Sequence, residues 1–381
     1  MNHAIRAGRG VRLTETQRRD WLRLIRSQNV GPRTFRDLLN RFGDAAAALE
    51  ALPVLARRGG RRAIRVASTD DADRELEAAA RADARFVALG EPDYPHALAA
   101  ADSPPPLLAL RGEATVLTNR AVGMVGSRNA SLAGAKMTER LATGLGRAGY
   151  TVVSGLARGI DAAAHRASLS TGTIACMAGG LDCPYPPENV PLMDEIAERG
   201  AVVSEMPFGW EPRARDFPRR NRLIAGMTLG TVVIEAAKRS GSLITGRLAN
   251  EMGRVVMAVP GSPLDPRAAG ANDLIKRGAQ LVTSTADVLE ILDPMLEAPH
   301  SHVGTLLEPV EEPFHDPASP LPDERERVLL ALGPTPCTVD ELIAHCGSSA
   351  ATVQMILLEL QLAGRLDRQE GGHVALVRDD P

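Results

Sequence analysis

The 381-residue chain has few aromatic side chains and no long apolar run. Phe, Trp and Tyr make up 3% of the residues, which argues against a protein that binds its ligand on rows of stacked rings. No apolar run reaches the roughly 18 residues of a membrane span, and the opening MNHAIRAGRGVRLTETQRRDW lacks the apolar stretch of a signal peptide. The four cysteines form no CxxC pair, so neither a disulfide framework nor a zinc cluster is indicated. These absences predict a cytoplasmic protein.

The chain also has little net charge, −3, but its charges are segregated along the sequence. Residues 1–65 carry 15 basic side chains against 5 acidic ones, and residues 121–286 carry 19 against 14. Residues 287–326, in contrast, carry 1 basic side chain against 11 acidic ones. Such segregation is typical of an anion-binding surface with acidic flanks, so near-neutrality does not exclude a nucleic-acid binder.

Helical periodicity over residues 14–56 predicts an N-terminal helical domain, expected to span residues 1–75. Thr14 and Gln17 form a capping signature, and a glycine-containing turn at residues 29–32 separates two helical patterns. This arrangement resembles a helix-hairpin-helix or SAM-like domain, in which free backbone N–H groups would meet a phosphate. A small helical bundle that only packs or binds protein is the alternative, and the sequence leaves both open.

From residue 121 the pattern changes to short apolar runs separated by helix-sized stretches. Runs of this kind are typical of strands buried on both faces of a parallel sheet. The alternation therefore predicts a doubly wound α/β domain, expected over residues 76–293. The expected strands are 121–126, 151–155, 173–178, 201–206, 231–236, 254–260 and 279–283, with 86–89 and 107–110 as candidate edge strands.

Residues 294–322 hold seven Pro among acidic and small residues, which predicts an extended linker. Helical patterns at 324–332, 338–345 and 349–363, followed by a hairpin-like end, predict a winged-helix-like domain over 323–381. The helix in the place of a recognition helix, SAATVQMILLELQLAG, contains no Lys or Arg. Because a helix that reads DNA normally carries such residues, we expect a structural or protein-binding module.

Small and hydroxyl residues follow the predicted strands at five points. Because the carboxyl ends of parallel strands meet at one edge, these turns are expected to lie together and offer N–H and hydroxyl donors to phosphates. The alternative is that these Gly and Ser residues only form the turns. The turn sequences are GSRN at 126–129, SGLARGID at 154–161, GG at 179–180, KRSGSLIT at 238–245 and PGS at 260–262.

The strongest local charge lies at residues 213–222, with five Arg and one Asp in ten positions. A solvated surface usually interleaves charges of both signs, and this segment does not. Phe217 lies within it and could stack on a base, while Asn221 could read a base edge or hold the loop. The segment favours a site that follows a nucleic-acid backbone over ordinary surface arginines.

Signatures of catalysis are weak, and no catalytic residue, cofactor or metal is predicted. No G-x-x-x-x-G-K-[ST] is present, the first turn is not G-x-G-x-x-G, and no carboxylate cluster suggests a two-metal nuclease. Asp161 and His165 stand four residues apart at a helix start and could form an acid/base pair. A helix cap with a partnered His is the simpler interpretation. His300 and His302 give at best a weak metal signal.

One enzymatic alternative rests on residues 230–235, GTVVIE, which resemble the G-T-x-x-E of nucleoside-monophosphate phosphoribohydrolases. Glu235 stands one residue later than in that motif, and the preceding Pro-Gly-Gly is absent. A nucleotide hydrolase that uses Glu235 therefore stays as the alternative function.

Seven ordered motifs run through residues 105–285. They are VGSR at 125–128, SGLARGIDAAAH at 154–165, YPPEN at 185–189, FPRRNR at 217–222, SGSLIT at 240–245, VPGS at 259–262 and GANDLIKRGA at 270–279. Together they resemble the DNA-processing protein A family, also called DprA or Smf. The predicted terminal domains also fit the layout of this family.

The resemblance implies a non-catalytic protein that binds single-stranded DNA entering the cell during natural transformation, protects it and helps to load the RecA recombinase. An extended Rossmann-like domain would self-associate into homodimers and hold the DNA in a positively charged pocket. Neither a cofactor nor membrane insertion is implied, and duplex DNA is left open as a second ligand.

The same resemblance implies which residues bind DNA. Ser127 and Arg128 would grip a phosphate, Phe217 would stack on a base, and the loop at residues 238–245 would add N–H and hydroxyl donors. The three arginines of the FPRRNR motif would neutralise the backbone. The full predicted set is Gly126, Ser127, Arg128, Ser154, Gly155, Arg158, Arg213, Phe217, Arg219, Arg220, Asn221, Arg222, Lys238, Ser240, Gly241, Ser242, Thr245 and Lys276.

Overall fold

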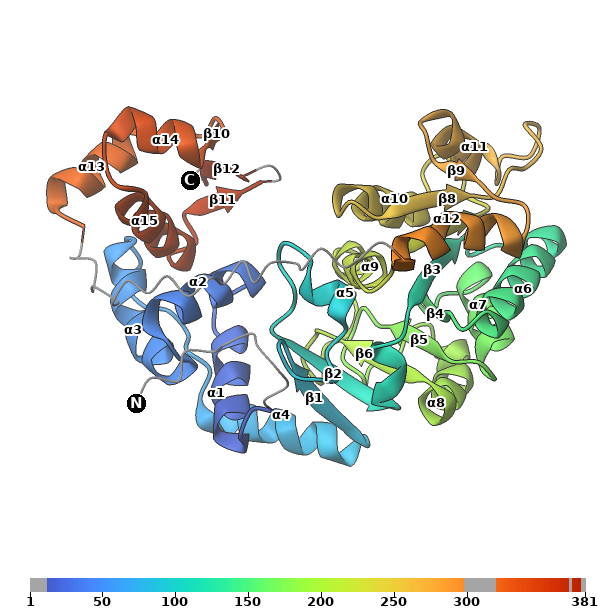
Figure 1. Cartoon of the computed structure of the whole chain (residues 1–381). Helices are drawn as coiled ribbons and strands as arrows, with labels where there is room; N and C mark the ends of the chain where they lie inside the picture. The colour runs from blue at the N-terminus through green and yellow to red at the C-terminus, as the bar shows by residue number, and fades with distance from the viewer. Residues whose placement is uncertain (1–11, 298–319, 370–371, 378–381) are drawn as a thin grey trace. The chain divides into compact units, whose positions relative to one another are not determined.

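The structure is a computed structural model that describes residues 12–297, 320–369 and 372–377 (Figure 1). The chain divides into two compact units. Of the described residues, one unit contains Leu13–Asp73 together with 320–369 and 372–377, and the other contains residues 74–297. The first therefore holds the terminal domains, and the second holds the predicted α/β domain.

The N-terminal part forms helices where the sequence predicts them. Thr14 caps the first helix in a capping box with Gln17, and Gly31 caps the second helix, which begins with a proline. The rings of Trp21 and Phe35 pack edge to face with centroids 5.0 Å apart, which joins these two helices. The helices are α1 (Glu15–Arg26), α2 (Pro32–Phe42), α3 (Ala45–Arg58) and α4 (Thr69–Arg81).

The C-terminal part is the predicted winged helix. Its three-stranded sheet has the order β10-β12-β11, and apolar residues of all three helices meet in one core. The helix without Lys or Arg, α15, is buried over most of its length, as its apolar composition requires. The elements are α13 (Pro322–Ala331), β10 (Cys337–Thr338), α14 (Val339–Cys346), α15 (Ala350–Leu362), β11 (Leu366–Arg368) and β12 (His373–Leu376).

A nine-stranded sheet forms the centre of the α/β unit, in the order β1-β2-β6-β5-β4-β3-β7-β8-β9. Strands β3 to β9 pair in parallel, and β1 and β2 add an antiparallel edge, so the doubly wound, mostly parallel fold is confirmed. The strands are β1 (Ala84–Ala88), β2 (Leu107–Gly112), β3 (Ala121–Gly126), β4 (Thr151–Ser154), β5 (Thr173–Cys176), β6 (Ala201–Ser204), β7 (Gly230–Ile234), β8 (Val255–Ala258) and β9 (Gln280–Leu281).

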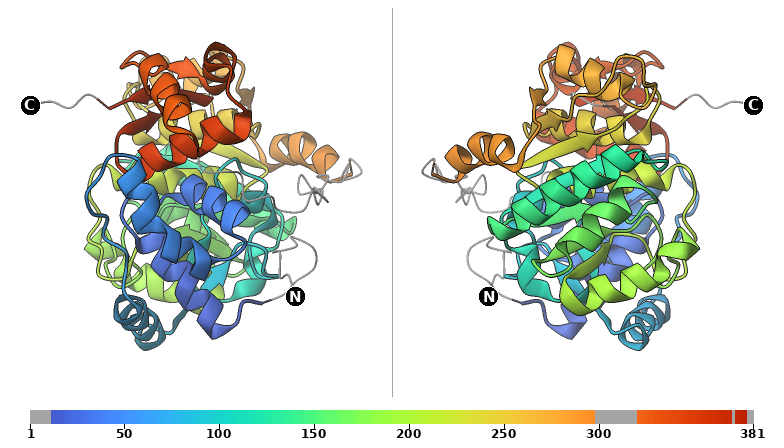
Figure 2. Two further views of the ribbon diagram at one scale, coloured as in Figure 1. Left: turned by 90° about the vertical axis from the view of Figure 1, so that its left-hand side faces the viewer. Right: turned by 90° about the vertical axis from the view of Figure 1, so that its right-hand side faces the viewer.

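Helices cover both faces of this sheet. Residues of α6, α7 and α12 pack in one core beneath one face, and residues of α5, α9 and α11 pack in a second core on the other. The right-hand view of Figure 2 shows α6, α7 and α8 side by side. The helices are α5 (His96–Ala99), α6 (Leu132–Arg147), α7 (Ile160–Ser168), α8 (Val190–Arg199), α9 (Asp216–Gly226), α10 (Gly241–Glu251), α11 (Ala269–Lys276) and α12 (Thr285–Glu297), with short 3-10 turns η1 (Ala114–Leu117) and η2 (Pro187–Asn189).

This topology places a switch point between β3 and β7. The chain moves from β3 through β4 and β5 to β6, then crosses back to β7 and continues outward to β9. Neighbouring strands whose crossovers leave in opposite directions open a crevice at their carboxyl ends, where ligands of such folds bind.

The expected linker begins later than predicted, because α12 continues through Pro294 to Glu297. Leu296 packs against the core beside α6, and this apolar contact extends the helix past the proline. Residues 298–319, which hold most of the predicted linker and the two histidines at 300 and 302, lie outside the described residues. Within the described residues, none of the helices combines the length and apolar character needed to cross a bilayer.

Candidate nucleic-acid interface

A small pocket opens at the carboxyl ends of β3, β4 and β5. The turn after β3, the turn after β4, the loop after β5 and the first turns of α9 each contribute to it. The structure therefore brings together turns that are far apart in the sequence, as the parallel topology requires. The pocket is lined by Arg128, Gly155, Ala157, Arg158, Tyr185, Pro186, Phe217 and Arg220.

Aromatic rings and guanidinium groups meet in this pocket around Phe217. The Cζ atoms of Arg128 and Arg220 lie 5.2 and 5.8 Å from the centroid of its ring. Tyr185 meets the same ring edge to face, with centroids 5.9 Å apart and planes at 69°. Tyr185 is 48% exposed, so part of its ring is open to a ligand. The pocket thus combines positive charge with apolar ring surface, which are the two features that hold single-stranded nucleic acids.

Tyr185 is absent from the predicted set of residues. It stands in the YPPEN motif, where a single aromatic residue among prolines gives no periodic signal. The rarity of tyrosine could have drawn attention to Tyr185, because the chain has only three Tyr. In the structure the other two, Tyr94 and Tyr150, are buried.

Arg220 forms the floor of the pocket rather than its surface. Its side chain is 5% exposed and donates hydrogen bonds to the carbonyl oxygens of Gly155 and Cys176, the latter at 2.9 Å. Burial lowers its pKa, while the charge of the nearby Asp161 opposes that shift. Arg220 therefore ties the ends of β4 and β5 together, and its Nε and Nη1 are engaged within the protein instead of being free for phosphate as the sequence prediction supposed. A Cβ on Gly155 would lie 2.0 Å from its Nη1, so only glycine fits there.

Asp161 and His165 hold the turn after β4. The carboxylate of Asp161 accepts hydrogen bonds from the backbone N–H groups of Gly155 and Ala157 at 3.2 and 3.3 Å. His165 is fully buried; its Nε2 accepts from the N–H of Leu156, and its Nδ1 lies 2.8 Å from the hydroxyl of Thr173. Burial lowers the pKa of His165 to about 3, so the ring is neutral. His165 is therefore the partnered histidine of the simpler interpretation. The helix cap of that interpretation is wrong, because Gly159 is the N-cap of α7 without a side-chain hydrogen bond and the Asp161 carboxylate binds the turn that precedes the helix.

The turn that carries Arg128 is held by its neighbour. The carbonyl oxygen of Ser127 accepts a hydrogen bond from the N–H of Ile160 at 3.1 Å, and its hydroxyl accepts from the N–H of Asn129. Gly159 has φ +71°, and a Cβ there would lie 2.3 Å from the Ser127 carbonyl oxygen, so the close approach requires glycine. Arg128 is exposed and, in the described part of the chain, has no acidic partner.

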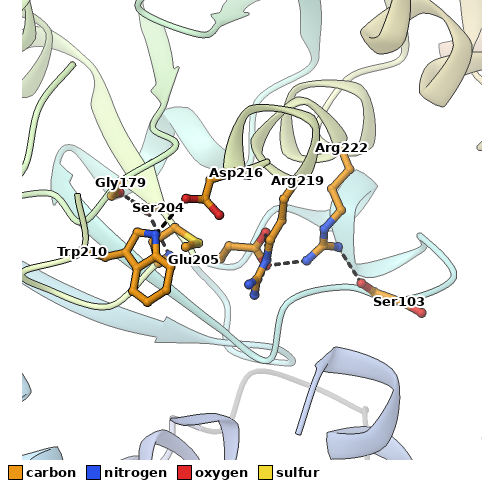
Figure 3. A network of polar contacts seen from close by, with 9 residues as sticks. Ser103, Gly179, Ser204, Glu205, Trp210, Asp216, Arg219 and Arg222 are labelled. Atoms are coloured by element: carbon orange, nitrogen blue, oxygen red, sulfur yellow. Dashed lines mark hydrogen bonds and ion pairs between the residues drawn. The ribbon is translucent and has the colours of Figure 1, made fainter. Parts of the chain in front are cut away.

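Two predicted backbone-neutralising arginines share one carboxylate (Figure 3). Glu205, 3% exposed, directly follows β6 and accepts from the Nε of Arg219 at 3.0 Å and from the guanidinium of Arg222. Arg222 also donates to the carbonyl oxygen of Ser103 at 2.7 Å. Arg219 keeps an exposed part of its guanidinium, whereas Arg222 is largely enclosed. Glu205 lies 14 and 17 residues before these two arginines in the sequence, so the motif by itself does not show that their charges are paired.

Asp216 organises the loop before α9. Its carboxylate accepts a hydrogen bond from the indole N–H of Trp210 at 2.9 Å (Figure 3). It also accepts one from the backbone N–H of Arg213 at 2.9 Å. The Arg213 guanidinium lies 4.9 Å from the centroid of the Trp210 ring. Arg213 is exposed beside the pocket-forming helix but does not line the pocket.

The turn between β7 and α10 lies at the next carboxyl end along the sheet. Ser240 caps α10, and its hydroxyl lies 2.7 Å from that of Ser242. Asn221 donates to the carbonyl oxygen of Gly241 at 3.3 Å and so holds this turn against α9. Ser242 and Thr245 are buried, so of the predicted donors here the exposed ones are Lys238 and Gly241.

Three other predicted residues have structural positions and do not line the pocket. Ser154 is fully buried and donates to the carbonyl oxygen of Met124 at 2.6 Å, so it cannot contact DNA. A Cβ on Gly126 would lie 1.9 Å from the carbonyl oxygen of Ile234, which shows that this glycine serves strand packing. Lys276 is the last residue of α11 and precedes the start of β9, so it lies on the side of the sheet where the strands begin, whereas the pocket lies where they end.

Glu235, the residue of the enzymatic alternative, is tied to the start of α6. It adopts a left-handed backbone conformation with φ +51°, and its carboxylate accepts from the N–H of Ser131 at 2.9 Å and from the Ser131 hydroxyl. The carboxylate thus supports the N-cap residue of α6. A group held in this way is not placed as a free general acid or base.

Known families match all three parts of the chain. Residues 85–293 match the family described as DNA recombination-mediator protein A. The chain belongs to this family. Residues 15–78 match the DprA-like N-terminal HHH domain, and residues 312–372 match the DprA winged helix domain, so the predicted family and its layout are confirmed.

Relatives of the family extend over most of the chain. It is 38% identical to the Smf protein of Escherichia coli over 289 residues, which is 75% of each chain. It is 34% identical to the Smf protein of Synechocystis, covering 75% of this chain and 79% of that protein. The DprA protein of Streptococcus pneumoniae is 47% identical over 198 residues, 51% of this chain and 70% of that protein.

Solved structures of two family members resemble this one. The crystal structure of DprA from Streptococcus pneumoniae has a TM-score of 0.61 and 35% identity, and covers 74% of this chain and 99% of its own. DprA from Helicobacter pylori, whose structure is described as giving insight into a single-stranded DNA binding mode, has a TM-score of 0.51 and 26% identity. It covers 57% of this chain and 97% of its own.

Proposed function

We propose that this chain is a non-catalytic, cytoplasmic DprA protein that binds single-stranded DNA in natural transformation, protects it and helps to load RecA. The observation that carries this proposal is the pocket, where the exposed Arg128 lies beside the rings of Phe217 and Tyr185. A cation for the phosphate next to rings for the bases is the combination that binds single strands without sequence preference. The Helicobacter pylori relative, described as a single-stranded DNA binder, supports it.

Each pocket residue has a distinct part in this proposal. Arg128 binds a phosphate, and Phe217 stacks on the adjoining base, with Tyr185 as the second ring of the same wall. Arg158 stands at the rim, where its pairing with Glu188 balances part of its charge. The side chain of Arg219 stays partly exposed although it pairs with Glu205, and in this proposal it binds a further phosphate.

A binding titration tests the proposal. Fluorescence anisotropy of a labelled oligo-dT should show binding by the full-length protein, and Arg128→Ala should raise Kd by a similar factor for oligo-dT and for mixed sequences, because phosphate contacts carry no sequence information. Arg199→Ala is the matched control, since Arg199 is an exposed arginine on α8 outside the pocket. Wild-type protein that does not bind, or equal losses in both variants, would overturn the proposal.

The hydrolase alternative is not favoured, because Glu235 is engaged at the start of α6. Incubation with AMP, followed by assay for free adenine and ribose 5-phosphate, tests it directly. We expect no release. Release that disappears in Glu235→Gln would replace our proposal with the enzymatic one.

The homodimer and the RecA partner are proposals that follow from family membership. Sedimentation velocity over a range of protein concentrations tests the first, with a concentration-dependent dimer expected. RecA filament assembly on single-stranded DNA tests the second, with faster assembly expected for wild type than for Arg128→Ala. A monomer at all concentrations, or no effect on RecA, would contradict these two proposals separately.

A further inference from the structure

A row of unpaired cations runs along the outer side of α6. Lys136, Arg140 and Arg147 are all exposed, and none forms an ion pair or hydrogen bond within the described residues. Their spacing of four and seven residues places them within about 40° of each other around the helix, since each residue turns it by about 100°. With Thr143 between them, they form one stripe, which we call the α6 stripe.

The α6 stripe lies along an open groove of 520 Å³. Gly144 forms part of its floor, where Thr285 at the start of α12 approaches so closely that a Cβ would lie 2.2 Å from the threonine hydroxyl. On the other side, Thr143 donates to the carbonyl oxygen of Ala167 near the end of α7. The groove is therefore lined by α6 and by the start of α12, and Thr143 links its α6 side to α7.

Three exposed arginines on other helices of this unit form ion pairs within or beside their own helix, whereas Arg166 on α7 and Arg199 on α8 form none within the described residues, like the α6 stripe. Arg81 on α4, Arg247 on α10 and Arg277 at the end of α11 each pair with an acidic residue four positions away. Lys136 and Arg140, in contrast, are four residues apart with like charge, an arrangement that destabilises a helix. Glu139 is the acidic residue that lines the groove, and it forms no ion pair with these cations.

The direction of α6 connects the stripe to the pocket. Its N-cap, Ser131, follows the turn of Arg128 and bonds to Glu235 at the carboxyl end of β7, so the helix begins at the pocket edge of the sheet. Lys136 is the stripe residue nearest that edge and Arg147 the farthest. The rise of a helix gives about 16 Å between them, enough for several consecutive phosphates of a strand.

We propose that the α6 stripe is a second DNA-backbone site, which binds the phosphates of a single strand that continues out of the pocket. This rests on the proposed function, because the pocket supplies the first contact. The stripe carries cations and a threonine hydroxyl but no aromatic ring, so it follows the backbone without stacking bases. A strand too short to leave the pocket gains nothing from it.

The test compares oligonucleotide lengths in the full-length protein. The stripe variant combines Lys136→Gln, Arg140→Gln and Arg147→Gln, and the matched control combines Arg81→Gln, Arg247→Gln and Arg277→Gln, which removes the same charge from paired positions. Anisotropy is measured with oligo-dT of roughly six and roughly thirty nucleotides at several salt concentrations.

The stripe variant should bind the long strand about tenfold more weakly than wild type, while affinity for the short strand stays within about twofold. Its slope of log affinity against log salt should be shallower by about 2, for three phosphates on a single strand. Glu139→Gln should act in the opposite sense and strengthen binding of the long strand.

Three results would overturn the inference. They are unchanged binding of the long strand, an equal loss in the control combination, and an equal loss for both strand lengths. Unchanged DNA binding would leave the stripe to an acidic protein partner instead. Failure of the wild type to bind the short strand would instead refute the proposed function, so the two failures can be told apart.

Discussion

Replacing Phe217 with alanine tests how the pocket holds a base. The ring has one edge-to-face neighbour in Tyr185 and two guanidinium neighbours within 6 Å, so it is fixed before a ligand arrives. Stacking of a base on such a ring contributes about 1–3 kcal/mol by alanine substitution. Kd for oligo-dT should therefore rise about 5- to 150-fold in Phe217→Ala.

An abasic oligonucleotide separates stacking from an indirect effect on Arg128. If Phe217 stacks on a base, wild type loses affinity when bases are removed from the strand, and Phe217→Ala loses little more. The two losses should thus not add, which a double-mutant cycle between protein and strand measures by anisotropy. A loss that is the same for abasic and normal strands would refute stacking and assign the ring to holding the guanidinium of Arg128 in place.

Four further outcomes follow from the structure. Arg128→Ala should make the dependence of log affinity on log salt shallower by about 0.7, as expected for one lost phosphate contact in a salt titration; an unchanged slope contradicts that role. Gly155→Ala places a Cβ against the buried guanidinium of Arg220 and should lower the free energy of unfolding by about 1–3 kcal/mol. Gly241→Ala is the control, because the space around Gly241 is open and the free energy of unfolding should not fall; denaturant unfolding measures both variants. Because burial lowers the pKa of His165 to about 3 from its ordinary 6.5, the folded state holds the ring neutral while the unfolded chain protonates it. Stability should therefore fall as pH drops from about 6.5 towards 3, by up to about 1.4 kcal/mol per pH unit, and parallel curves for wild type and His165→Gln would contradict this. Deletion of residues 323–381 should leave affinity for single strands nearly intact, because α15 has no basic residue and is largely buried; a large loss in anisotropy would show otherwise.

The order of strands and helices was predictable because each buried strand is a short apolar run bounded by turn residues. The same alternation predicted the edge at which the turns meet, and the pocket lies there. Pro294 shows the limit of this reasoning. Composition marks it as the start of a linker, but the apolar contact of Leu296 carries the helix past it.

The individual site residues were harder to predict, because a residue type does not show what lies across from it in space. The motif alone predicts Arg220 and Arg222 as free cations. In the structure Arg220 is buried against carbonyl oxygens, and Arg222 pairs with Glu205. Ser154 reads as a donor in a glycine-rich turn, but it faces inward. These partners are distant in sequence, and no local pattern identifies them.

The shared carboxylate beneath Arg219 and Arg222 has a consequence for the thermodynamics of capture. An arginine side chain without a partner loses much conformational entropy when it binds an anion. Here Glu205 has already immobilised the guanidinium planes during folding, so the association step forfeits less conformational freedom. The same carboxylate repels the incoming phosphate, so Glu205 weakens the electrostatic attraction of the DNA while it holds the guanidinium groups in a fixed orientation.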